Sequence, residues 1–104
     1  MKHFILIIIV LPFFLSGQNA TIDSLKSALK NAKHDTTKCN VLEYLISLEE
    51  ENEPWLAYNI ELKKIAEKNV SHSDLKTQKL FLRFLADALY NIAYLDDEYG
   101  NSKE

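Results

Sequence analysis

Residues 80–95 read LFLRFLADALYNIAYL and form the longest apolar segment after residue 17, so the rest of the fold has to pack around them. Only Arg83, Asp87 and Asn91 interrupt its apolar residues, which would cover well over half the circumference of a helix. We expect the helix itself to run over residues 75–99, a length of roughly 37 Å at 1.5 Å per residue. Because one neighbour cannot cover so wide an apolar face, this helix requires partners on more than one side.

Three further helices are expected before it, over residues 22–32, 37–51 and 54–69. Each shows apolar residues at steps of three and four, which is the spacing of one helix face. No glycine occurs between residues 18 and 99, whereas a β-sandwich or small barrel needs turns of that type about every 8–12 residues. The sequence therefore predicts an all-α fold of four antiparallel helices.

Several residues predict where these helices begin and end. Asp35 or Thr36 would be the N-cap of the second helix, and Pro54 would occupy the first position of the third. Asn69 would end the third helix in a left-handed conformation. The glutamates 49–51 oppose the dipole at the end of the second helix, so we expect fraying or compensation there.

The apolar residues of helix 75–99 are predicted to divide between two uses. Leu85, Leu89 and Ile92 would form the centre of its packing against the second and third helices. The remaining large residues would exceed what three short neighbours can bury, so the helix would present an unfinished interface. The predicted interaction surface consists of Phe81, Phe84, Ala88, Tyr90, Tyr94 and Leu95.

Residues 1–17, MKHFILIIIVLPFFLSG, have the plan of a secretory signal peptide. Lys2 gives a positive start, an apolar run from Phe4 to Leu15 follows, and small residues come next. The run is shorter than the roughly 17–25 residues of a membrane-spanning helix. We expect cleavage after Gly17 and a periplasmic or extracellular protein; the alternatives are an uncleaved signal anchor or a buried N-terminal helix.

The composition argues against several classes of function. The net charge is −3, whereas nucleic-acid-binding domains are usually basic. No glycine-rich loop is present to cradle a phosphate, and a single cysteine makes neither an internal disulfide nor a thiolate zinc site. We therefore expect a protein that is not an enzyme, with no cofactor, no metal, no nucleic-acid partner and no small-molecule ligand.

The candidates for a thiol–imidazole pair are Cys39 with His34 or His72. A thiol–imidazole pair would lack a third orienting group, although a position near a helix start can lower a thiol pKa. We favour a small buried residue for Cys39 and solvent-exposed residues in the interhelix links for the two histidines, rather than a metal pair.

Aromatic and acidic residues offer the remaining candidates. Trp55 and Tyr58 are expected to pack between helices, while the tyrosines of helix 75–99 either pack or line a peptide groove. The acidic runs 49–53 and 96–98 are expected to be solvated surface, with contact to a basic partner as the alternative. Three adjacent carboxylates on a helix do not form a calcium loop.

Residues 84–101 resemble the first helix of a tetratricopeptide repeat (TPR). The resemblance rests on Leu89, Asn91-Ile92-Ala93 and the closing Gly100-Asn101. Asn52-Glu53-Pro54-Trp55-Leu56-Ala57 is similar to the opening of a second helix, and Ile65-Ala66-Glu67-Lys68 to its ending. Residues 22–25 and 35–38 resemble a lead-in that follows the signal peptide in exported TPR proteins of Bacteroidetes bacteria.

The resemblance implies antiparallel helical hairpins, a fragment of a TPR-like α-solenoid over residues 18–104. A complete repeat has about 34 residues, so the second helix of the last repeat would follow residue 104. The chain then looks like the N-terminal portion of a longer sensor kinase or transcription regulator, membrane-anchored in that parent, or a truncated product. First helices mainly build the concave face of such arrays, which points to helix 75–99 as the binding element.

Two functions follow as expectations. The first is a non-catalytic interaction scaffold, the extracytoplasmic input region of a bacterial signalling protein, whose partner is a peptide or the downstream TPR helices. The second is a free-standing secreted protein that self-associates through helix 75–99, so its partner is another copy. Contact with a membrane would come only through the signal peptide or a downstream segment.

Overall fold

The computed structural model describes residues 20–71 and 74–102. These residues form a helical segment over 20–31, α2 (Asp35–Leu48), α3 (Asn52–Asn69) and α4 (Leu75–Ser102). The described part of the chain contains no strand, so the predicted all-α class is confirmed. The predicted signal peptide, residues 1–17, lies outside the described residues.

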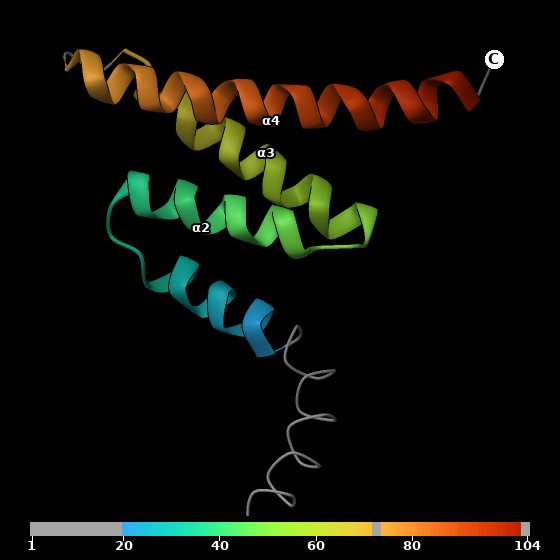
Figure 1. Ribbon diagram of the computed structural model, residues 1–104, viewed down its shortest axis with the longest axis horizontal. Coiled ribbons are helices and arrows are strands. Elements are labelled where there is room, and N and C mark those ends of the chain that lie inside the picture. Colours follow the sequence, from blue (N-terminus) through green and yellow to red (C-terminus); the bar gives the residue numbers. More distant parts are fainter. Residues whose placement is uncertain (1–19, 72–73, 103–104) are drawn as a thin grey trace, which may run out of the picture.

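Consecutive helices run in opposite directions along the chain (Figure 1). As a result, α2 and α4 run the same way, and α3 runs against both. α3 packs against both of them and more extensively against α4. The third helix in the chain is therefore the element that holds its two neighbours at fixed positions.

α2 begins and ends earlier than the sequence predicted. His34 occupies the N-cap position, with φ −110° and ψ 139° and no side-chain cap, so neither Asp35 nor Thr36 is the cap. Asp35 lies in the first turn, where the helix dipole stabilises a carboxylate. The helix ends at Leu48, and Glu49 is already extended. The chain thus leaves the helix before the three glutamates that would oppose its dipole.

α3 ends at Asn69 as predicted, but its start and the conformation of Asn69 differ from the prediction. It begins at Asn52, which puts Pro54 third, but still in the first turn where a missing N–H breaks no bond. The Trp55 N–H donates to the Glu51 carbonyl at 3.1 Å. No non-glycine residue in the described ranges has a positive φ, so Asn69 is not left-handed. Its side chain instead donates to the Ile65 carbonyl at 2.8 Å.

The hydrophobic core lies where α3 meets α2 and α4. Phe81 and Phe84 are its largest members, and their rings meet edge to face with centroids 5.9 Å apart. Leu29 of the segment 20–31 and Tyr58 of α3 pack against its edge. The buried members of this cluster are Cys39, Leu42, Leu62, Ile65, Ala66, Phe81, Phe84 and Ala88.

The predicted orientation of α4 is wrong. Four residues were expected to be more than the neighbouring helices could bury, yet each is at most 4% exposed; they are Phe81, Phe84, Ala88 and Leu95. Leu89, expected at the centre of the packing, is 44% exposed, while Leu85 and Ile92 are only partly buried. The physical reason is that burying two phenylalanines removes more apolar surface than burying two leucines, and Ala66 and Ala88 are small enough to sit beside them.

Candidate interaction groove

An open groove of about 350 Å³ lies between α2 and α4. α2 contributes Glu43, Ile46 and Ser47 to its walls, and the buried Leu62 of α3 lies beneath. α4 contributes Asp87, Tyr90 and Asn91. We call this set of seven residues the α2–α4 groove.

The helix spacing explains why these side chains meet. On α2, Glu43 and Ser47 lie four residues apart beside the buried stripe of Leu42 and Leu45, so they share one flank. On α4, Asp87 and Asn91 have the same spacing beside the buried stripe that contains Phe84 and Ala88. Each helix therefore turns a polar edge toward the other while its apolar stripe faces α3.

A carboxyl pair dominates the electrostatics of the groove. Burial, then a hydrogen bond with Asp87, then the negative charge of Asp87 raise the pKa of Glu43 to about 7, against a smaller opposing effect of the Arg83 guanidinium. Close to neutral pH, Glu43 is therefore about half protonated, and its protonated carboxyl group donates a hydrogen bond to the Asp87 carboxylate. A cation that enters the groove would favour the ionised form of Glu43.

A buried asparagine fixes the position of the α4 wall. Asn59 is completely buried on α3, and its Nδ2 donates to the Trp55 carbonyl at 3.0 Å. Its Oδ1 accepts a hydrogen bond from Asn91 Nδ2 at 2.9 Å. Because a buried amide left unpaired is costly, this bond sets the register of α4 on α3 and holds Asn91 at the groove.

A second hollow, of about 180 Å³, lies between α4 and the first turn of α3, together with the link that joins α2 to α3. Glu49 and Glu50 follow the C-terminal end of α2, and Glu98 follows Asp87 along α4, so the second hollow lies farther along in the direction in which both helices run. Its lining again combines carboxylates with aromatic rings. The lining residues are Glu49, Glu50, Asn52, Trp55, Tyr94, Leu95 and Glu98.

Each of the two hollows is lined by one exposed tyrosine of α4. Tyr90 lines the α2–α4 groove and is 72% exposed, and Tyr94 lines the second hollow and is 59% exposed. The two residues are one helical turn apart, so they form a continuous aromatic edge on α4. Large exposed aromatic rings beside a hollow are common at protein-binding surfaces.

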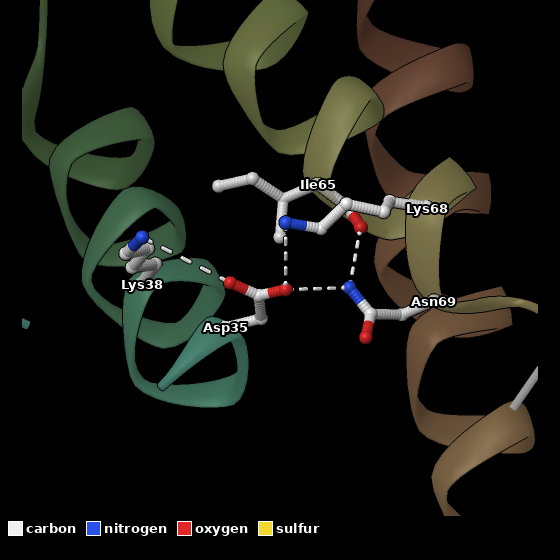
Figure 2. Close-up of polar contacts among 5 residues, drawn as sticks. All are labelled: Asp35, Lys38, Ile65, Lys68 and Asn69. Carbon is white, nitrogen blue, oxygen red and sulfur yellow. Dashed lines mark hydrogen bonds and ion pairs between the residues drawn. The ribbon is translucent and has the colours of Figure 1, made fainter. Parts of the chain in front are cut away.

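A separate polar cluster closes the opposite end of the α2–α3 hairpin. Figure 2 shows Asp35 of α2 facing Lys68 and Asn69 of α3, with Asn69 Nδ2 donating to Asp35 Oδ2 at 2.8 Å. Lys68 Nζ lies 3.3 Å from the same oxygen, and Lys38 Nζ lies 3.9 Å from Oδ1. The Asn69 hydrogen bond first, and then the two lysines, hold the pKa of Asp35 below its usual value in spite of partial burial.

Cys39 lies inside the hydrophobic core, away from solvent. It is fully buried in the core, which confirms the interpretation of a small buried residue. Burial, together with the charges of Asp35 and Glu43, raises the pKa of its thiol to about 12, so the alternative of a lowered thiol pKa is wrong. His34 is exposed at the start of α2, and His72 lies outside the described residues.

The structure separates the six residues of the predicted interaction surface. Phe81, Phe84, Ala88 and Leu95 are buried inside the chain, whereas Tyr90 and Tyr94 are exposed and line the two hollows. Of the aromatic residues expected to pack between helices, Trp55 and Tyr58 are both partly buried. From the acidic runs, Glu49, Glu50 and Glu98 line the second hollow.

Sequence reasoning missed the carboxyl pair and the asparagine bridge. The available signal on α4 was the set of polar interruptions at Arg83, Asp87 and Asn91, which fall on one stripe at steps of four. No comparable signal marks Glu43 or Asn59, whose neighbours are contributed by another helix.

Comparisons with known proteins leave the family open. The chain matches no protein-family model, no curated protein and no solved structure. Within residues 20–71 and 74–102, no helix combines the length and the apolar character needed to cross a membrane. The same residues contain no cluster of three or more His, Cys, Asp or Glu side chains arranged to hold a metal ion.

Proposed function

We propose that the chain is a non-catalytic, TPR-like protein-interaction scaffold that binds an extended basic peptide segment along α2 and α4. The observation that carries this proposal is the pair of successive hollows along α4, both lined by carboxylates and by an exposed tyrosine. Carboxylates attract lysine and arginine, and aromatic edges contribute apolar and cation–π contact to the same side chains.

The arrangement of the helices supports the TPR-like part of the proposal. In a TPR array the first helices of successive repeats lie side by side, run the same way and line the binding face. α2 and α4 run the same way and form the two walls of the groove, with α3 packed against both. α3 would then be the second helix of the first repeat, in agreement with the motif resemblance over residues 52–57.

The spacing of the charges specifies the ligand further. Asp87 and Glu98 are eleven residues apart on α4, or about 16 Å at 1.5 Å per residue. An extended peptide rises about 3.3 Å per residue, so about five residues span that distance. The preferred ligand therefore carries two basic residues about five positions apart.

The proposed cellular role combines this groove with the sequence of residues 1–17. If these residues direct export, the groove faces the periplasm or the exterior, where a scaffold acts as the input region of a bacterial signalling protein. N-terminal sequencing of the protein recovered from the exported fraction tests this part. A species that retains Met1 or remains in the cytosol would contradict it.

Peptide binding is tested by titrating the protein with a fluorescein-labelled peptide that carries two lysines five positions apart. We expect saturable binding that weakens with added salt, and at least tenfold weaker binding in the Asp87→Asn variant because half of the carboxyl pair is lost. The intrinsic fluorescence of Trp55, the single tryptophan of the chain, should change on titration because Trp55 lines the second hollow.

The matched control is Asp96→Asn, which changes an exposed aspartate of α4 that lines neither hollow. This variant should bind the peptide like the unmodified chain. Equal binding of a peptide with glutamates in place of the lysines, or an unchanged affinity in Asp87→Asn, would refute the proposed ligand class.

A further inference from the structure

α4 carries a second apolar face that the described helices leave uncovered. Leu75, Leu82 and Leu89 are 63%, 51% and 44% exposed, and they recur at steps of seven residues. The partly buried Leu85 and Ile92 lie three residues after Leu82 and Leu89 on the same side of the helix, and Leu85 also packs against the edge of the core. We call these five residues the leucine face.

The leucine face points away from the groove. Residues two positions apart in a helix lie about 200° apart around its axis, so Leu89 is on the opposite side from Asp87. The groove and the leucine face are therefore separate surfaces, and occupation of one does not require the other to be empty.

The spacing of the leucine face is that of a helix-pairing seam. Leu82, Leu85, Leu89 and Ile92 follow one another at steps of three, four and three residues. Two long helices that pair along their length bury apolar residues with this heptad spacing against each other. Ala86 and Ala93 lie beside the seam and are exposed, so small side chains border it and allow a close approach.

The charges of α4 indicate which helix covers this face. The basic residues Lys76, Lys79 and Arg83 all lie in its N-terminal half. Apart from Asp87, which lines the groove, its acidic residues lie in the C-terminal half, and they are Asp96, Asp97 and Glu98. A second copy lying parallel would align like charges along the whole contact, whereas an antiparallel copy brings each basic half to an acidic half.

We propose that the leucine face binds a second copy of this chain, with the two α4 helices antiparallel about a twofold axis. In this register Leu82 meets Ile92 of the second copy, and Leu85 meets Leu89 of the second copy. Lys79, which borders the seam on one flank, then lies near Asp97 of the second copy, because Asp97 is on the same flank and only about 3 Å along the axis from the position directly opposite Lys79. The same patch serves both copies, as twofold symmetry requires.

The first test measures the oligomeric state of the full chain by sedimentation at increasing protein concentration. We expect a concentration-dependent dimer, and a dimer dissociation constant at least tenfold higher for Leu82→Glu. The matched control is Ile60→Glu on α3, because Ile60 has the same exposed fraction, 51%, as Leu82. This control should dimerise like the unmodified chain, and far-UV circular dichroism checks that both variants remain folded.

The second test determines the orientation. Lys79→Glu and Asp97→Lys should each weaken the dimer at least tenfold, and the double variant should restore it, because the charges exchange places across an antiparallel contact. In a mixture of Lys79→Cys and Asp97→Cys chains, a bifunctional thiol reagent should join position 79 of one copy to position 97 of the other. Cys39 does not compete because it is buried.

Three outcomes would overturn the proposal. The first is a monomer at every concentration, which would leave the leucine face to another helix of a longer chain or to a different protein. The second is a dimer that survives Leu82→Glu. The third is a double charge reversal that fails to restore the dimer, or crosslinks that join position 79 only to position 79.

Discussion

Glu43 shows how one side chain links the stability of this protein to its binding surface. Its carboxyl group lies next to Asp87 across the groove, and burial with that neighbour raises its pKa to about 7. The protonated form is therefore favoured in the folded chain, while the unfolded chain ionises Glu43 near its ordinary value of 4.5. The folded state binds more protons between these two values, so its stability falls as the pH rises from about 4.5 through about 7.

Replacing Glu43 with glutamine should remove this pH dependence. Glu43→Gln keeps a neutral side chain next to Asp87 at every pH, so we expect a higher melting temperature than the unmodified chain at pH 8 and a similar one at pH 4.5. Thermal unfolding monitored by circular dichroism at the two pH values measures the difference. Glu61→Gln, which changes an exposed residue of α3 outside both hollows, is the control and should leave the profile unchanged.

Asp35 has the opposite dependence on pH. Its pKa is held below the usual value by Asn69, Lys68 and Lys38, so it contributes stability above its unfolded pKa of about 3.8. That contribution is lost as the pH falls through the lower folded value. In a plot of stability against pH, the loss of stability in acid is therefore assigned to Asp35, and the loss toward neutral pH is assigned to Glu43.

We expect Asp35→Ala to lower the free energy of unfolding at pH 7 by about 1.5 kcal/mol, a typical value for a hydrogen bond to a charged group. The variant should also lose less stability than the unmodified chain when the pH is lowered toward 3. Urea unfolding at pH 7 and pH 3 tests both statements. Asp23→Ala, an exposed aspartate of the segment 20–31, should change neither measurement.

Among the helices, α4 is the one whose buried face could not be predicted from the sequence pattern. Its apolar residues cover so much of the circumference that several orientations would bury a comparable number of them. Phe84 faces α3 and is fully buried, whereas Leu89 is 44% exposed on the side away from the groove. The two phenylalanines decide between the orientations because they have the most apolar surface to bury.

This orientation predicts very unequal effects of two truncations on α4. Phe84→Ala should cost about 3–5 kcal/mol, the usual value for a buried phenylalanine. Leu89→Ala should cost no more than about 1 kcal/mol, since about half of the side chain is already in water. Urea unfolding at a protein concentration below that of self-association gives both values. A larger effect at Leu89 than at Phe84 would contradict the observed orientation.

At the scale of the whole molecule, the alternating directions of the helices create the groove. Because α3 runs against both neighbours, α2 and α4 run the same way, and each turns a polar edge toward the other. Glu43 and Asp87 are 44 positions apart in the sequence and meet only in this arrangement. The buried bond between Asn59 and Asn91, 32 positions apart, keeps the register that brings them together.

The amino-acid sequence predicted the all-α class and the approximate positions of the four helices that the described residues form. These properties depend on local interactions, since helical hydrogen bonds join residues four positions apart and helix-breaking glycines are absent between residues 18 and 99. It also indicated Tyr90 and Tyr94 as surface residues, together with acidic runs that the structure places along the second hollow.

The buried face of α4 and the set of residues that form the groove depend on contacts between different helices. A helix with a wide apolar face can bury any of several sides, and its packing partner selects one of them. Packing against α3 buries Phe81 and Phe84 and leaves Leu89 exposed. The Glu43–Asp87 and Asn59–Asn91 pairs likewise join residues of different helices. Periodicity along one helix carries no information about such contacts, because it records only which residues of that helix share a side.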